Sequence, residues 1–229
     1  MKEIVADIVE DLKLLSSENH KKGFAHFKIE DSTALGVSMP RIRELAKRIG
    51  KDGELANELW NTQVHECKLL ATLVANPKTF SQSEADQWVL DFYSWDICDQ
   101  ANSNLFRKTN FIWESIFEWI KLEGEFQRRA GFAGLAVLAV HHKNADDQLF
   151  LNSLECIEKY ATDNRNFVKK AINWSIREMG KRRINLHQPC IDLCYRLANI
   201  DSPAAKWIAT DALRELQSEK VLNRLNKLK

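Results

Sequence analysis

Residues that could carry out chemistry gather in two stretches of this 229-residue chain. In the first stretch, Trp95 and Asp99 are four positions apart, so on a helix an aromatic ring and a carboxylate would stand one turn apart. A carboxylate beside an aromatic wall can be partly desolvated and can stabilise a nearby cation. A single carboxylate is more often a helix cap or a surface residue, so this pair by itself leaves both roles open.

The second stretch, residues 163 to 183, is strongly basic, with seven cationic side chains against Asp163 and Glu178. At 100° per residue, its core-forming side chains fall on one face of a helix: Val168, Ile172, Ser175, Ile176 and Met179. The opposite face carries Lys170, Trp174, Arg177 and Lys181. Cations suited to phosphates around an aromatic plate suited to a sugar or base are typical of a nucleic-acid groove. The alternative is a Trp packed against a neighbouring repeat beside cation–π partners.

The helix predicted to begin at Trp95 shows the same division into two faces. Ile97, Ala101 and Leu105 share the core face. The outer face carries Trp95, Asp99, Asn102 and Phe106. Two helices with a Trp off the core, one acidic and one basic, indicate a shared cleft.

The elements that must position these residues are helices. Only 8 Gly and 4 Pro serve the whole chain, too few turn formers for a sandwich or barrel. Ser38 and Pro40 predict the start of a helix over 39 to 49, and Gly50 predicts its end. Apolar spacing from Ile4 to Leu15 predicts a first helix. Further helices are predicted at 54–61, 63–76, 82–93, 95–108, 110–122, 125–142, 146–161, 165–182, 185–198 and 203–217.

A weak internal repeat consists of a basic residue followed by small and apolar residues. It recurs at Lys68, Arg129, Lys170 and Lys206, the last two intervals being 41 and 36 residues. That length fits a two-helix HEAT-type unit, in which stacked helix pairs form a superhelix with one concave face. The sequence therefore predicts an all-α fold of HEAT-like repeats in a single domain over residues 1–229. An irregular helical bundle is the alternative.

Several motifs together resemble the AlkD family of alkylpurine DNA glycosylases. Three of them occur in the family's order: Ser94-Trp95-Asp96-x-x-Asp99, Gln127-Arg128-Arg129-Ala130 and Lys170-Ala171-Ile172-x-Trp174-x-x-Arg177-Glu178. The segment from Leu35 to Arg43 also resembles the family's N-terminal signature. The similarity thus covers most of the chain.

The resemblance implies a basic concave surface that holds duplex DNA and excises purines alkylated at N3 or N7. In that comparison Asp99 stabilises the charge that develops on the sugar and orients water, while Trp95 and Trp174 pack against the deoxyribose. Arg129 holds a backbone phosphate. The other expected DNA contacts are Lys170, Arg177, Lys181, Arg128 and Arg43. Members of this family are understood to act without the base pocket that most glycosylases use.

Three positions depart from the family's pattern. Family members often have a second Trp at the position of Ser94, an aromatic hydroxyl at that of Phe27 and an amide near Ser38. Two further hypotheses therefore stay open. One is a non-catalytic protein that binds bent or branched DNA, and the other is a helical scaffold whose Trp residues anchor a protein partner.

Composition limits the remaining possibilities. The net charge is +1, so any basic surface must arise from segregation of charge along the chain. No stretch approaches the ~20 apolar residues that cross a bilayer, and the first residues lack the pattern of a signal peptide. We expect no membrane association, a cytoplasmic location and a monomer. Five cysteines without framework spacing predict reduced thiols. Neither a metal site nor a nucleotide or other cofactor is expected, since His65-Glu66-Cys67 and Cys190-x-x-x-Cys194 miss zinc-deaminase spacing by one residue.

Overall fold

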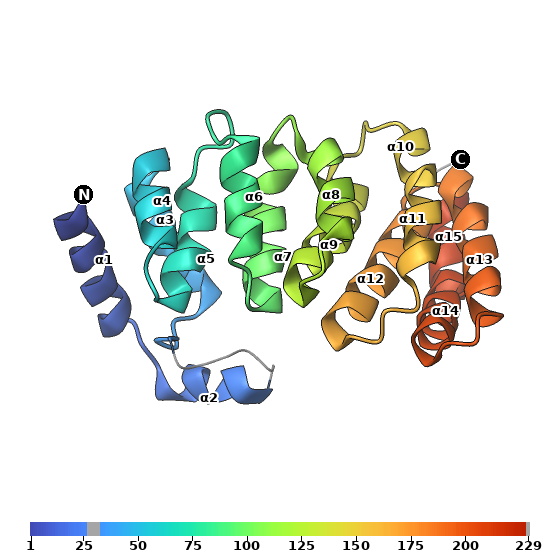
Figure 1. The fold of residues 1–229 in the computed structure, drawn as a ribbon, viewed down its shortest axis with the longest axis horizontal. Helices are drawn as coiled ribbons and strands as arrows, with labels where there is room; N and C mark the ends of the chain where they lie inside the picture. Colours follow the sequence, from blue (N-terminus) through green and yellow to red (C-terminus); the bar gives the residue numbers. More distant parts are fainter. Residues whose placement is uncertain (27–32, 228–229) are drawn as a thin grey trace. The chain divides into compact units, whose positions relative to one another are not determined.

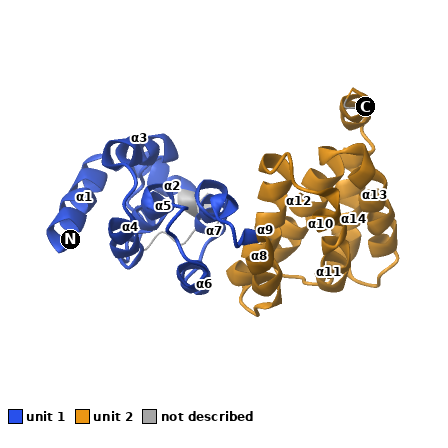
Figure 2. Ribbon diagram, turned by 90° about the horizontal axis from the view of Figure 1, so that it is seen from above, with its two compact units in different colours: residues 1–112 blue, residues 113–229 orange. Residues whose placement is uncertain are grey.

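The computed structural model describes residues 1–26 and 33–227, and within these ranges the secondary structure is entirely helical (Figure 1). The chain divides into two compact units, residues 1–112 and 113–229 (Figure 2). Unit 1 contains α1 (Lys2–Leu14), α2 (Glu18–His26), α3 (Met39–Ile49), α4 (Gly53–Trp60), α5 (His65–Val74), α6 (Gln82–Leu90), α7 (Trp95–Asn104) and the 3-10 turn η1 (Phe106–Lys108). The prediction of one domain over residues 1–229 concerns how the units are joined and stays a prediction.

Unit 2 continues the same pattern of helices joined by short connections. It contains α9 (Glu125–His141), α10 (Asp147–Leu151), α11 (Ser153–Tyr160), α12 (Asn166–Arg182), α13 (Ile184–Ala198), α14 (Pro203–Leu216) and α15 (Glu219–Asn226). A further helix, α8 (Ile112–Lys121), begins at the last residue of unit 1.

Most predicted helices are confirmed, and 39–49 is confirmed at both ends. The helix predicted over 146–161 divides at Asn152 into α10 and α11. Two helices were not predicted, α2 and α15. Ser38 is the N-cap residue of α3, so the predicted start is confirmed, but its hydroxyl makes no cap hydrogen bond. A carboxylate from α5 accepts a hydrogen bond from the preceding Val37 amide instead.

In unit 1, equivalent helices lie side by side and run in the same direction. Trp60 of α4 stacks on Trp88 of α6 with ring centroids 4.0 Å apart. At one end of α5, His65 contacts Asp96 of α7, and at the other end the Thr72 hydroxyl accepts a hydrogen bond from Asn104 at 3.0 Å. Matching ends that meet each other make α5 and α7 parallel, as successive repeats of a solenoid require.

In unit 2, α9, α12 and α14 form a second parallel row. The backbone amide of Phe167, at the start of α12, donates to Glu125 at the start of α9 (2.9 Å). At the far end, Arg182 of α12 donates to the carbonyl of Ala139 on α9 (3.0 Å). On the other side of α12, the amide of Asn173 donates to the Ile208 carbonyl of α14 (3.2 Å).

These rows explain the internal repeat. The four basic positions fall on α5, α9, α12 and α14, and the intervals of 41 and 36 residues each correspond to one helix pair. The interval from Lys68 to Arg129 is longer because it contains α7, which is the parallel neighbour of α5. Within unit 1, α7 carries the acidic Asp99 near the start of the helix, where α5 carries the basic Lys68.

The predicted core faces are largely confirmed. On α12, Val168 and Met179 are fully buried, as is the intervening apolar ridge, and on α7 the same holds for Ile97 and Ala101. The placement of Asn102 and Phe106 on the outer face of α7 is wrong, since both are fully buried. The α-helix ends at Asn104, and the 3-10 turn that follows points Phe106 inward among aromatic rings.

Candidate functional site

Trp95 and Asp99 lie at the start of α7, one turn apart, and both are partly exposed. Trp95 packs against the buried Ala34. The indole is therefore held by the protein, and the Asp99 carboxylate lies one helical turn away from it. This confirms the predicted position of the two residues on one helix, whereas their chemical role stays a prediction.

A polar network centred on the buried His65 involves the residues on either side of Trp95 in the sequence. The Nε2 atom of His65 is 2.8 Å from Oδ2 of Asp96, and its Nδ1 is 3.0 Å from the Tyr93 hydroxyl. The other oxygen of Asp96 accepts hydrogen bonds from the Ser94 hydroxyl (2.6 Å) and from the Ile97 amide (2.9 Å). His65 is fully buried and Ser94 is 1% exposed. The network fixes the residues on both sides of Trp95, so the first turn of α7 is rigid.

The electrostatics of Asp96 follow from these partners. Burial by itself would raise the pKa of this carboxyl, but the hydrogen bond and charge of His65, with the Ser94 hydroxyl and the Ile97 amide, lower it below its ordinary value. Asp96 is therefore an ionised structural carboxylate. Asp99, three residues further on, is the carboxylate at the partly exposed face.

The segment before α3 is ordered by a second buried carboxylate, Glu66. Its two oxygens accept hydrogen bonds from the backbone amides of Leu35 (2.9 Å), Gly36 (2.7 Å) and Val37 (3.1 Å). Gly36 has a φ of +84°, and a Cβ there would lie 2.7 Å from the Ser17 carbonyl oxygen. The N-terminal signature thus encodes a tight turn clamped between α5 and the start of α2.

This turn leads into α3, where Arg43 is exposed to solvent. No ion pair of Arg43 occurs in the part of the chain that the structure describes. Ser38 is partly exposed at the N-cap of α3. Phe27, the third departure from the family's pattern, lies outside the described residues.

On α12, the four residues of the predicted outer face differ in their contacts with α14. Lys170 is exposed and Trp174 is partly buried. Arg177 and Lys181 are engaged with α14: Glu215 lies 2.5 Å from Arg177 Nε and 2.6 Å from Lys181 Nζ. Lys181 also contacts Glu178 at 2.8 Å. Two of the four outer-face residues are thus paired with Glu215, a carboxylate of α14 that the helical pattern of α12 could not show.

Glu215 is held in its charged form by these contacts. Burial would raise the pKa of Glu215, but the hydrogen bond from Lys181 and the charges of Arg177 and Lys181 lower it. A phosphate that approaches Arg177 or Lys181 must therefore compete with an ionised carboxylate.

Arg128 and Arg129 lie in the packing between α9 and α12. Arg128 donates to Asp163 (2.7 Å) and to the Ile120 carbonyl (3.0 Å). Arg129 is only 6% exposed and donates to the Phe167 carbonyl (2.7 Å). Both guanidinium groups therefore fix the start of α12, and contacts of these groups with DNA stay a prediction.

The structure brings the predicted residues together in two groups. Trp95 and Asp99 share α7 in unit 1, and Lys170, Trp174, Arg177 and Lys181 share α12 in unit 2. A common site that combines Trp95 and Trp174 stays a prediction. The sequence analysis did not predict the structural roles of His65, Asp96, Glu66 and Glu215. The one signal in the sequence was spacing, because each lies about 30 to 40 residues, or one helix pair, from the residue it contacts.

The residues considered for metal binding have other roles or are separated. His65 and Glu66 serve the two buried networks of unit 1. All five cysteines are free, and burial raises the pKa of Cys194 to about 12. Among residues 1–26 and 33–227 there is no group of three or more His, Cys, Asp or Glu that could hold a metal ion. In the same ranges, no helix is both long enough and apolar enough to cross a membrane.

Comparison with known families decides the relationship. A family described as "DNA alkylation repair enzyme" matches residues 8–216. This chain belongs to the DNA alkylation repair enzyme family. The match includes α7, α9 and α12, so every site residue predicted above lies within the part that is shared with the family. No curated protein matches the chain.

Among solved structures, the DNA alkylation repair chain is similar to one described as "a new family of proteins related to the HEAT-like repeat DNA glycosylases with affinity for branched DNA structures". The TM-score is 0.76 at 20% identity, and the alignment covers 92% of this chain and 95% of that chain. This likeness confirms the all-α, HEAT-like repeat fold. The concave basic face stays a prediction.

Two designed armadillo repeat proteins also match. Their TM-scores are 0.39 and 0.37, with identities of 12% and 14%. The alignments cover 81% and 77% of this chain and 79% and 92% of the designed chains.

Proposed function

We propose that this protein hydrolyses the N-glycosidic bond of cationic N3- or N7-alkylated purines in duplex DNA. The observation that carries the proposal is the pair on α7: Asp99 is partly exposed one turn from Trp95, on a first turn fixed by the buried His65–Asp96 contact. Membership of the DNA alkylation repair family supports the substrate class.

The chemistry needs little from the protein because the lesion is already charged. In an N7- or N3-alkylated purine the base leaves with the electron pair of the glycosidic bond and becomes neutral, while positive charge develops on the deoxyribose. The carboxylate of Asp99 stabilises that charge, and the nearby indole of Trp95 excludes bulk water from one side of the sugar. Water then adds to C1′ and loses a proton, which leaves an abasic site and the free base.

Trp174 and the cations of α12, in unit 2, are the further DNA contacts of the proposal. Trp174 packs against a deoxyribose, Lys170 contacts a backbone phosphate, and Arg177 and Lys181 do so when a phosphate replaces Glu215. Arg43 gives a further phosphate contact from α3. Arg128 and Arg129 hold the start of α12 in place and thereby position its DNA contacts.

Base release from methylated DNA tests this function. The purified protein is expected to release 7-methylguanine or 3-methyladenine above the spontaneous rate, and Asp99→Asn is expected to reduce release strongly while the affinity for DNA changes little. Asp7→Asn, at an exposed residue of α1, is the matched control for loss of one negative charge. Release at the spontaneous rate by the unaltered protein would exclude the proposal.

A second candidate is the binding of branched DNA without base excision; the similar HEAT-like structure is described as belonging to a family with affinity for branched DNA structures. The observation that favours it is Ser94, which is buried and donates to Asp96, so this position offers no second aromatic surface to DNA. Tight binding of a four-way junction without base release would support this candidate. A protein scaffold, by contrast, would show little change in partner affinity as salt rises.

A further inference from the structure

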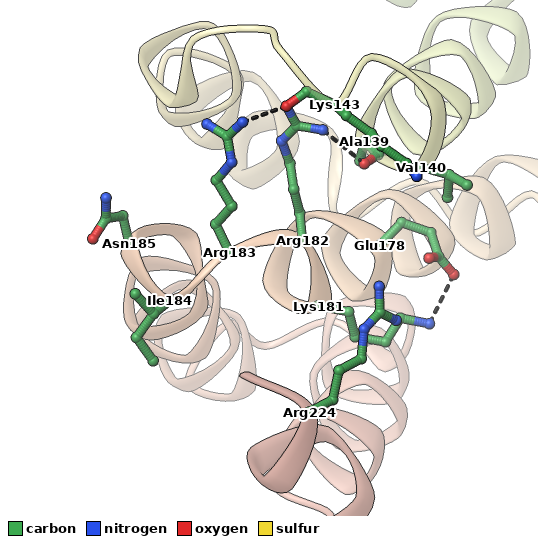
Figure 3. Close-up of a pocket in the computed structure, with 10 residues that line it drawn as sticks. All are labelled: Ala139, Val140, Lys143, Glu178, Lys181, Arg182, Arg183, Ile184, Asn185 and Arg224. Carbon is green, nitrogen blue, oxygen red and sulfur yellow. Dashed lines mark hydrogen bonds and ion pairs between the residues drawn. The ribbon is translucent and has the colours of Figure 1, made fainter. Parts of the chain in front are cut away.

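A pocket of about 540 Å³ lies at the C-terminal ends of α9 and α12, entirely within unit 2 (Figure 3). Its volume is within the ~300–1,000 Å³ typical of sites for small molecules, so a nucleotide-sized segment fits. It is lined by five cationic side chains and one carboxylate, that of Glu178; the cations are Lys143, Lys181, Arg182, Arg183 and Arg224. The pocket therefore favours an anion.

Within the pocket, two arginines cover the carbonyl groups at the C-terminal end of α9. The C-terminus of a helix is negative because its last carbonyls lack partners. Here Arg182 donates to the carbonyls of Ala139 (3.0 Å), His142 (2.6 Å) and Lys143 (3.0 Å), and Arg183 also donates to Lys143. Two guanidinium groups thus cover the end of α9. Asp147, 3.1 Å from Arg183 and 3.8 Å from Arg182, balances one of their two charges, so an anion placed there meets one net positive charge.

Two cations on the rim remain available to a ligand. Lys143 and Arg224 are both exposed, and neither forms an ion pair within residues 1–26 and 33–227. In Figure 3 they come from opposite sides of the pocket, Lys143 from the segment after α9 and Arg224 from α15, where it reaches toward Lys181 and Glu178. A phosphate held between them would gain two charge-assisted contacts.

The lining also includes an apolar part. Val140 is 44% exposed and Ile184 is 42% exposed, and both contribute to the pocket. Exposed aliphatic groups beside cations suit a ligand that alternates charged and apolar parts. The backbone of a nucleic acid does so, because a deoxyribose follows every phosphate.

We propose that this pocket binds the phosphodiester backbone of DNA, with Lys143 and Arg224 as phosphate contacts and Val140 and Ile184 against the sugar. The pocket adjoins the cationic face of α12 through Lys181. The proposal rests on DNA binding in the proposed function and not on base excision. It is therefore tested on unmodified duplex, where excision plays no part.

The experiment measures the affinity of the full chain for a fluorescent unmodified duplex by anisotropy over a series of salt concentrations. The double variant K143A/R224A is expected to bind roughly ten- to a hundredfold more weakly at low salt, and the slope of log affinity against log salt should fall by about 2 in magnitude. The matched control K159A/K220A removes two other exposed lysines, on α11 and α15. Circular dichroism verifies that each variant is folded.

An unchanged affinity and slope in K143A/R224A would overturn the proposal, as would an equal loss in K159A/K220A, which would show an effect of net charge alone. Inorganic pyrophosphate, titrated separately and followed by NMR, distinguishes a second source of phosphate. If it shifts the signals of Val140 and Ile184 while K143A/R224A binds DNA normally, the pocket is a site for free phosphates and the assignment to DNA is wrong.

Discussion

The Nε2 atom of His65, which is fully buried, lies 2.8 Å from Oδ2 of Asp96. One helix thus begins with two aspartates in different environments. Asp96 joins α7 to α5, whereas Asp99 stands at the partly exposed face where the proposed chemistry occurs.

Replacement of Asp96 by Ala is expected to destabilise the protein by about 2–4 kcal/mol, because the buried His65 and Ser94 would lose their shared acceptor. Urea unfolding followed by circular dichroism measures the change. Tyr93→Phe removes only the hydroxyl that contacts His65 and should cost about 0.5–1.5 kcal/mol. If the Asp96 variant lost no more stability than the Tyr93 variant, the network would not be what fixes α7.

Gly36 and Gly50 provide a matched pair for the turn before α3. Their φ angles are +84° and +83°, but a Cβ at Gly50 would meet nothing within 4 Å, while one at Gly36 would lie 2.7 Å from the Ser17 carbonyl oxygen. Gly50→Ala should therefore cost only the backbone strain of about 1–3 kcal/mol. Gly36→Ala should cost at least about 1 kcal/mol more, because the backbone must also move. Equal unfolding free energies for the two variants would contradict this account of the turn.

Glu215→Gln is expected to increase the affinity for DNA several-fold. The change removes the charge that lies 2.5 Å from Arg177 and 2.6 Å from Lys181. Arg177 then keeps Asp211 at 3.5 Å and Lys181 keeps Glu178 at 2.8 Å, so both cations attract phosphates more strongly than before. The slope of log affinity against log salt should become steeper by about 1–2. Asp201→Asn is the control, since it removes the same charge beside Lys206, on another part of unit 2. An equal increase in both variants would show that only net charge matters.

Asp163 makes the stability depend on acid pH. Burial would raise the pKa of its carboxyl, but hydrogen bonds from Arg165 and Arg128 lower it to about 2, from an ordinary value of 3.8. A folded-state pKa below the unfolded one stabilises the protein above about pH 4, and this contribution is lost as the pH falls toward 2. The difference in Tm between the unaltered protein and Asp163→Asn should therefore shrink between pH 5 and pH 2. A constant difference over that range would show that Asp163 does not act through its charge.

The sequence by itself determined the local structure of this protein. The helix over residues 39–49, the buried ridge of α12 from Val168 to Met179 and the position of Trp95 and Asp99 on one helix all followed from periodicity and from start and stop residues. These features depend on contacts within a few residues along the chain, which a helical wheel describes correctly.

Only the tertiary structure decided how the charged residues are used. His65 contacts Asp96, and Glu66 accepts a hydrogen bond from Gly36. Glu215 forms ion pairs with Arg177 and Lys181. The partners in each case are about 30 to 40 residues apart in the sequence. Such contacts arise from the register between stacked helices, which each helix's own pattern leaves open because several registers bury the same apolar face. The register therefore determines which cations are paired with carboxylates and which, like Lys170, stay exposed to solvent.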